Sequence, residues 1–195
     1  MARAPLNENV IVGAAAGLAD TAGLAAVTLS EVARTLSVRT PSLYGHVRDL
    51  AALRDGLTIL ALGELADRVG EAIAGRAGLD ALRGLCEAHR GYAREHPGRW
   101  EALQRRAGVA VVRSDAAVHA GRGMLAVLRG YDIEEGDQVH AVRVVAAAIN
   151  GFVELEHVGS FAHSEPPADD SWNVLILQLD ALLRRWNRTT AGGAA

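Results

Sequence analysis

Lysine is absent from the 195-residue sequence, so every basic side chain is an arginine. Aromatic residues make up only 4% of the chain, and β-branched residues seldom follow one another, whereas alanine, leucine and arginine dominate. Strands are enriched in aromatic and β-branched residues, so this composition disfavours them and favours helices. We therefore predict an all-α protein of about nine helices.

Cysteine occurs once, at Cys86, which excludes an internal disulfide. The apolar neighbours of Cys86 indicate a small core residue rather than a reactive thiol. No pairing of a nucleophile with a base is recognisable in the sequence, so we expect no catalytic residue, no metal ion and no cofactor.

Long apolar runs are also missing, because none approaches the roughly 20 residues that a membrane-spanning helix needs. Val10–Ala19 is apolar and follows Arg3, as in the core of a signal peptide, but the polar residues 7–9 interrupt that pattern. We therefore expect a folded cytoplasmic protein with no membrane partner.

Two helices can be read from the first 36 residues. Asn7 can cap the first helix, and Gly23 can end it. Thr28 and Glu31 have the spacing of a capping box, in which each side chain accepts a hydrogen bond from the backbone N–H of the other residue. This box predicts a second, short helix that ends near Leu36.

A tight turn at residues 37–39, followed by Thr40 and Pro41, predicts a third helix that ends near Val47. Thr40 would cap this helix, and Pro41 would occupy the first helical position, where its missing N–H costs nothing. Two short helices joined by such a turn form a helix-turn-helix, whose second helix fits a DNA major groove about 12 Å wide. Leu43 and Val47 are expected to face inward.

Six further helices are predicted from the apolar pattern and from the glycine and proline breaks. The last two are apolar over more of their surface than one buried face requires, so we expect them to pack against a second copy of the chain as well. The six ranges are 49–74, 79–95, 97–106, 114–129, 134–161 and 170–186.

The segment Ala33–Val47, ARTLSVRTPSLYGHV, resembles the DNA-binding domain of the tetracycline-repressor (TetR) family, and the match extends over residues 7–55. The resemblance implies a DNA-binding domain at residues 1–55, a helical ligand-binding and dimerisation domain at 56–188, and a disordered tail at 189–195. It further implies a homodimeric transcriptional regulator. In particular, it implies a repressor that a small-molecule effector releases from a palindromic operator in double-stranded DNA.

Roles within the motif also follow from the resemblance. Some positions correspond to base contacts, some to phosphate contacts, and two arginines flank them. These positions are Ser30, Thr40, Pro41 and Tyr44 for bases, Ser42, Tyr44 and His46 for phosphates, Arg39 and Arg48 for either, and Thr28 at the cap of the preceding helix. The structural alternative is that Tyr44 and His46 only pack or cap.

Two residues depart from the family pattern. Leu50 stands where many members carry a lysine that holds a phosphate, and Ser37 stands where glycine is common in the turn. Residues 1–55 carry five arginines, at 3, 34, 39, 48 and 54, and five acidic residues, at 8, 20, 31, 49 and 55, so their formal net charge is zero. We therefore expect modest non-specific DNA affinity that depends strongly on salt.

Tyr92–Trp100 is similar to the regulatory domain of one TetR subgroup, in which a His-Pro-Gly break separates two helices. That subgroup often shows His-Gly in its penultimate long helix, where this chain has Asn150-Gly151. A mostly apolar effector pocket with a few polar groups is expected in this region. The predicted ligand contacts are Trp100, Leu103, Met124, Asn150, Glu154, His157 and Phe161.

Three alternatives remain open from the sequence. Glu154 and His157 can be a solvated helical pair, and the helical body can serve dimerisation without sensing a ligand. An enzyme is the third alternative, because Glu154 and His157 have the Glu-x-x-His spacing of di-iron bundles. Such bundles need a second copy of that motif and two further glutamates. The dinucleotide-like stretch Gly121–Ala126 has no predicted strand before it.

Overall fold

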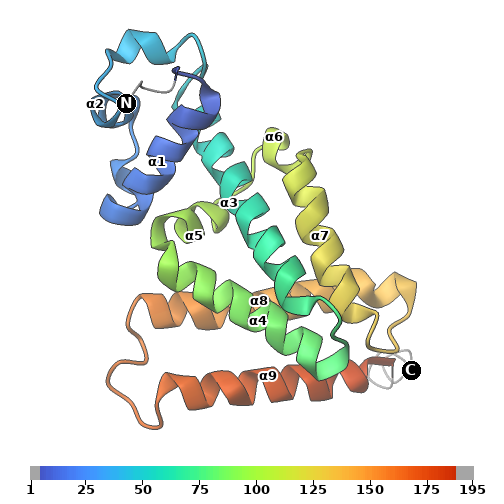
Figure 1. Cartoon of the computed structure of the whole chain (residues 1–195). Coiled ribbons are helices and arrows are strands. Elements are labelled where there is room, and N and C mark those ends of the chain that lie inside the picture. Colours follow the sequence, from blue (N-terminus) through green and yellow to red (C-terminus); the bar gives the residue numbers. More distant parts are fainter. Residues whose placement is uncertain (1–4, 188–195) are drawn as a thin grey trace. The chain divides into compact units, whose positions relative to one another are not determined.

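The computed structural model describes residues 5–187, which form α-helices and short 3₁₀ helices and contain no strand (Figure 1). The all-α prediction is confirmed. The predicted tail from Thr189 onward lies outside the described residues. The elements are α1 Glu8–Ala22, η1 Leu24–Ala26, α2 Leu29–Thr35, η2 Thr40–Leu43, α3 Leu50–Ile73, α4 Gly78–Glu95, α5 Pro97–Leu103, α6 Val109–Val112, α7 Asp115–Leu128, η3 Glu135–Asp137, α8 Gln138–His157 and α9 Ala168–Arg184.

The first helices begin and end where the capping residues predict. The Asn7 side chain accepts a hydrogen bond from the N–H of Val10 at 2.9 Å, and Gly23 ends α1 with a φ of 83°. The Thr28 hydroxyl accepts from the N–H of Glu31 at 3.2 Å, which confirms the Thr28 half of the predicted capping box. The Glu31 carboxylate pairs with an arginine one turn further along α2.

Three predicted helix ends need correction. α5 ends at Leu103 rather than near Arg106, and the short helix α6 follows it in a stretch where the sequence predicts a connection. α8 is shorter at both ends than the predicted 134–161, because η3 occupies its beginning and Gly159 lies just beyond its end. Gly159 has a φ of 77°, a left-handed conformation that commonly ends helices.

The predicted third helix is a 3₁₀ helix, η2, which covers Thr40–Leu43 and continues as turns to His46. Its N-cap is Arg39 rather than the predicted Thr40. A helix this short completes few α-helical hydrogen bonds, so the tighter 3₁₀ pattern is favoured. Leu43 is fully buried and Val47 is 4% exposed, so their predicted inward orientation is confirmed.

The chain divides into two compact units. The first contains the residues up to Glu64 together with Glu95–His119, and its core is formed by α1, α2, η2 and α3, with Ala102 of α5. The second contains Leu65–Arg94 and the residues from Ala120 onward, including the antiparallel hairpin of α8 and α9 (Figure 1). This division differs from the predicted boundary after residue 55, because α5 packs against α1.

Ser37, in the turn between α2 and η2, has a φ of 50°. This left-handed conformation costs a residue with a side chain roughly 1 kcal/mol and costs glycine little. We expect Ser37→Gly to raise the free energy of unfolding by up to about 1 kcal/mol. Ser30→Gly, at a helical position of α2, should lower it by about 0.5 kcal/mol. Urea denaturation measures both changes, and a loss of stability at both positions would contradict the strain at Ser37.

Candidate functional site

The polar surface of α2, η2 and their flanking turns is the candidate nucleic-acid interface. Tyr44 is 56% exposed, although it directly follows the fully buried Leu43. Thr40 is half-buried, and the other eight predicted DNA contacts are exposed. These eight are Thr28, Ser30, Arg39, Pro41, Ser42, Tyr44, His46 and Arg48. The structure therefore leaves the predicted residues accessible, and their role as DNA contacts stays a prediction.

Two arginines flank η2 and the turn after it, Arg39 before and Arg48 behind, and they differ in whether an acidic neighbour neutralises their charge. Arg39, at the N-cap of η2, is exposed and makes no ion pair with the described part of the chain. Arg48 donates through Nε to Asp49 at 2.8 Å. The pKa of the Asp49 carboxyl lies below its usual value, mainly because the N–H of Ala52 donates to it at 2.7 Å and also because Arg48 lies beside it. Asp49 therefore stays ionised while it caps α3, and it weakens the field of Arg48.

A close contact fastens α5 to α1 within the first unit (Figure 1). A Cβ atom added at Gly98 would lie 2.1 Å from the carbonyl of Ala19, so the two backbones touch. Beside this contact, Asp20 accepts a hydrogen bond from the N–H of Arg99 at 2.9 Å and lies 3.1 Å from its Nε. The Arg99 guanidinium also reaches Glu64 of α3 at 3.0 Å. α5 is therefore held by both α1 and α3.

Arg90 of α4 is the central charged group of the second unit, with a side chain that is 5% exposed. Its Nε donates to Glu156 of α8 at 2.9 Å, and its guanidinium lies 2.7 Å from Asp169 of α9. The guanidinium carbon is 5.8 Å and 5.1 Å from the ring centroids of Phe152 and Trp172. One side chain thus joins three helices through charge and through cation–π contacts.

The charge of Glu156 is fixed by this cluster. The hydrogen bond from Arg90 is the main reason that the pKa of the Glu156 carboxyl lies below its usual value, and burial opposes that shift. Sequence analysis missed this group, because Glu156 lies 66 positions from Arg90 and no local spacing connects them.

A small cavity of about 130 Å³ lies beside this cluster. It is lined by Ala93 and Arg94 of α4 and by Val153, Glu156 and His157 of α8. His157 is the predicted ligand contact that lines it. The wall thus combines apolar surface with an arginine, a carboxylate and an imidazole, which suits a small molecule with a few polar atoms.

The predicted ligand contacts are distributed over both units. Trp100 and Leu103 belong to the first unit, where Trp100 is 1% exposed. Met124, Asn150, Glu154, His157 and Phe161 belong to the second unit. Glu154 and His157 are both exposed, which fits a solvated pair as well as the rim of a binding site. The role of these residues in ligand binding therefore stays a prediction.

Three features of other protein classes are missing from the described residues. No group of three or more His, Cys, Asp or Glu side chains within residues 5–187 is placed to hold a metal ion. Gly121–Ala126 lies inside α7, and a continuous helix does not form the phosphate-binding turn of a dinucleotide site. None of the described helices is both long and apolar enough to span a membrane.

Comparison with known proteins gives matches to both the sequence and the fold. Residues 82–179 match the family described as "Tetracyclin repressor-like, C-terminal domain". The HTH-type transcriptional regulator Rv0681 of Mycobacterium tuberculosis is 32% identical over 98% of this chain and 87% of its own length. The HTH-type transcriptional regulator YobS of Bacillus subtilis is 32% identical over 84% of this chain and 85% of its own length. The crystal structure of the Streptomyces coelicolor TetR family protein ActR in complex with (S)-DNPA has a TM-score of 0.73 at 18% identity, covering 93% of this chain and 98% of that one.

Replacing Gly98 by alanine tests the contact between α5 and α1. The added Cβ would overlap the Ala19 carbonyl, so we expect Gly98→Ala to lower the free energy of unfolding by about 2–3 kcal/mol. Gly17, on the exposed side of α1, has no atom within 4 Å of its Cβ position, so Gly17→Ala should raise the free energy of unfolding by about 0.5–1 kcal/mol. Thermal denaturation compares the two variants. Equal tolerance of both would show that α1 and α5 are not in close contact.

Proposed function

Since the chain belongs to the TetR family of transcriptional regulators, we propose that it is a repressor that binds a palindromic DNA operator as a homodimer and leaves it when a small molecule binds. The observation that carries the proposal is the exposed polar surface of the helix-turn-helix, which lies over the buried anchors Leu43 and Val47. Because the protein acts on DNA, we place it in the cytoplasm.

The DNA sequence would be read in the major groove by the segment made of η2 and the turn after it, residues 40–46. Its exposed side offers the Tyr44 ring for apolar and hydrogen-bond contacts with base edges, while the hydroxyl of Ser42 and the ring of His46 can hold phosphates. Arg39 is available for a phosphate or a guanine, because it makes no ion pair with the described part of the chain.

Two recognition segments would be presented together by the dimer. α8 and α9 carry six large apolar side chains that remain exposed in the single chain, as the sequence predicts for helices that also bury a second face. Packing these helices against those of a second copy would place the recognition segments about one DNA turn apart, roughly 34–36 Å.

Release would require that ligand binding move the recognition segments. α4 carries one wall of the small cavity and continues through His96 into α5, which is fastened to α1 by Gly98 and Arg99. A displacement of the end of α4 would therefore be transmitted to the helix-turn-helix. A coupling of about 1–3 kcal/mol, or about 5- to 150-fold in DNA affinity, is sufficient for regulation.

Tyr44→Ala tests the recognition surface. The Tyr44 ring is exposed, so its removal should leave the fold and the dimer intact while specific affinity falls about 10- to 100-fold. A gel-shift assay on the DNA that flanks the chain's own gene measures the loss, and light scattering checks the dimer. Tyr44→Phe is the matched control, because it keeps the ring and removes only the hydroxyl. Wild-type footprints from Tyr44→Ala would refute the assignment.

Ala93→Leu tests the cavity. Ala93 is 3% exposed and lines the cavity, so a larger side chain should fill it. The probes are small-molecule fragments of up to about ten heavy atoms that raise the melting temperature of the wild type. We expect these fragments not to raise the melting temperature of Ala93→Leu, while the DNA affinity of the variant is unchanged. Ala51→Leu, at an exposed position of α3, should respond like the wild type. Fragments that stabilise both variants equally would place the effector site elsewhere.

A further inference from the structure

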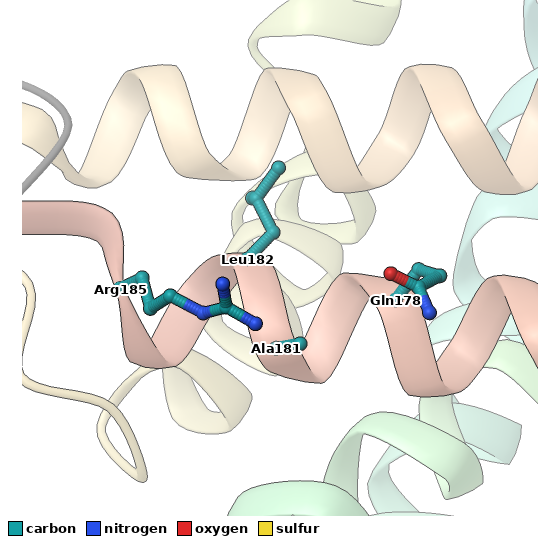
Figure 2. Close-up of a pocket in the computed structure, with 4 residues that line it drawn as sticks. All are labelled: Gln178, Ala181, Leu182 and Arg185. Atoms are coloured by element: carbon teal, nitrogen blue, oxygen red, sulfur yellow. The ribbon is translucent and has the colours of Figure 1, made fainter.

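The surface already proposed for the dimer includes the groove along α9 in Figure 2, which has a volume of about 330 Å³ and is lined by Gln178, Ala181, Leu182 and Arg185. A different surface surrounds the short helix α6 in the first unit. Val109 and Val112 of α6 are 68% and 64% exposed, more than any other large apolar side chain among the described residues. We call residues 104–113 the basic corner, because they contain no acidic residue and three exposed arginines: Arg105, Arg106 and Arg113.

Most of the exposed positive charge in the first unit that no acidic residue neutralises lies in the basic corner. Three other arginines of this unit pair with acidic neighbours: Arg34, Arg48 and Arg99. Arg54 is half-buried and donates to the carbonyl of Val27 at 3.3 Å. Within the described part of the first unit, the exposed arginines without an ion pair are Arg39 and the three of the corner. The corner therefore complements an anionic partner.

The chain brings the basic corner to the first turns of α3. Ala102 lies beside Thr58, whose hydroxyl donates to the Ala102 carbonyl at 3.3 Å. Further along the chain, a Cβ added at Gly108 would lie 2.6 Å from Oδ2 of Asp55. α7 then begins beside Gly63, where an added Cβ would lie 3.9 Å from the second residue of that helix. The stretch between Ala102 and Gly108 therefore runs toward the start of α3, and the chain turns back after it.

This end of α3 follows directly on the recognition segment, residues 40–46. Asp49 caps α3, and Asp55 lies six residues further on, about 9 Å along a helix that rises 1.5 Å per residue. Charges in water act on one another over about 8–10 Å at physiological salt. DNA held by the recognition segment would therefore pass within reach of the charges of the basic corner. Val111 is 4% exposed, so packing holds α6 in place.

The basic corner also decides the net charge of the first unit. That unit has nine arginines and nine acidic residues, so its formal net charge is zero, and without the three arginines of the corner it would be −3. A unit with negative net charge is repelled by DNA. The corner removes this repulsion close to the recognition segment.

We propose that the basic corner is a second DNA contact, which binds phosphates beside the half-site that the recognition segment reads. The proposal rests on the proposed function, because it requires the first unit to dock on DNA. DNA is favoured over an acidic protein because the corner belongs to the same compact unit as the recognition segment and lies at the end of α3 that follows this segment. Deoxyribose offers apolar surface between the phosphates, so the same backbone would cover Val109 and Val112. Phosphate contacts carry no sequence information, so the corner adds affinity without changing the preferred sequence.

Removing the charge of the corner tests the proposal. The corner variant combines Arg105→Gln, Arg106→Gln and Arg113→Gln. The matched control makes the same change at three exposed arginines of the second unit: Arg76, Arg122 and Arg129. Both variants lose the same net charge, so a difference between them reports the position of the charge and not its amount.

Fluorescence anisotropy over a range of salt concentrations measures binding to two duplexes, the DNA that flanks the chain's own gene and a shuffled sequence of equal length. Each phosphate contact contributes about 0.9 to the slope of log affinity against log salt. The slope should become shallower by about 2 or more in the corner variant, because each copy in a dimer loses at least one contact. Both duplexes should lose about tenfold or more in affinity at low salt. The control should keep the wild-type slope.

The outcomes separate this proposal from the proposed function. An equal loss on both duplexes supports phosphate contacts, whereas a loss confined to the flanking DNA would show base reading and overturn the proposal. A corner variant that keeps the wild-type slope would also overturn it and leave the corner for a protein partner, while specific binding by the wild type would keep the proposed function. A wild type that binds neither duplex at low salt would overturn both.

Local DNA cleavage tests the position of the corner independently. Arg106→Cys is coupled to an iron chelate that cuts nearby DNA, and Arg129→Cys, coupled in the same way, is the matched control. Cys86 is buried, and burial raises the pKa of its thiol to about 12, so it is not coupled. We expect cuts beside the protected half-site from position 106 and none from position 129. Protected DNA that the chelate at position 106 leaves uncut would overturn the proposal.

Discussion

The contact of Gly98 with the Ala19 carbonyl decides which parts of the chain move together. Because the two backbones touch, α5 cannot shift along α1 without breaking the contact, and Arg99 adds ion pairs to Asp20 and Glu64 on either side of it. The segment between α4 and α7 is therefore part of the body that carries the helix-turn-helix. A regulator that must move its recognition segments can do so by displacing this segment.

Arg90 has the corresponding role in the second unit. Its guanidinium is buried, and leaving it without partners would cost several kcal/mol, so Glu156 and Asp169 have to stay in place. These carboxylates belong to α8 and to the first turn of α9, and the rings of Phe152 and Trp172 pack on the same group. The two helices proposed to form the dimer are thus fixed by a charge on α4, the helix that also lines the small cavity.

Local signals predicted the N-terminal part of the fold well and the C-terminal contacts poorly. The Asn7 and Thr28 caps and the apolar positions Leu43 and Val47 act within a few residues of chain, so their effects can be read from spacing alone. The 3₁₀ form of η2 and the early end of α5 depend on whether a short segment forms i→i+3 or i→i+4 hydrogen bonds. The periodicity of apolar residues in the sequence does not show which pattern forms. Arg90 and Gly98 act through residues 66 and 79 positions away, respectively, so only the folded chain reveals their importance.

Because residues 1–55 carry equal numbers of basic and acidic side chains, the DNA affinity of the proposed dimer depends mainly on its geometry. Residues 1–55 have a formal net charge of zero, and Arg34 and Arg48 are paired with acidic neighbours. These residues can therefore draw little affinity from non-specific attraction to phosphates. When two copies are joined, the second half-site is met at an effective concentration near the millimolar range, but only if the spacing between the recognition segments matches the operator. A DNA-binding domain without net charge thus loses most of its operator affinity when the distance between the two recognition segments changes, because little non-specific electrostatic binding remains to compensate. In the proposed mechanism, a small displacement of α5 would therefore be enough to lower the DNA affinity.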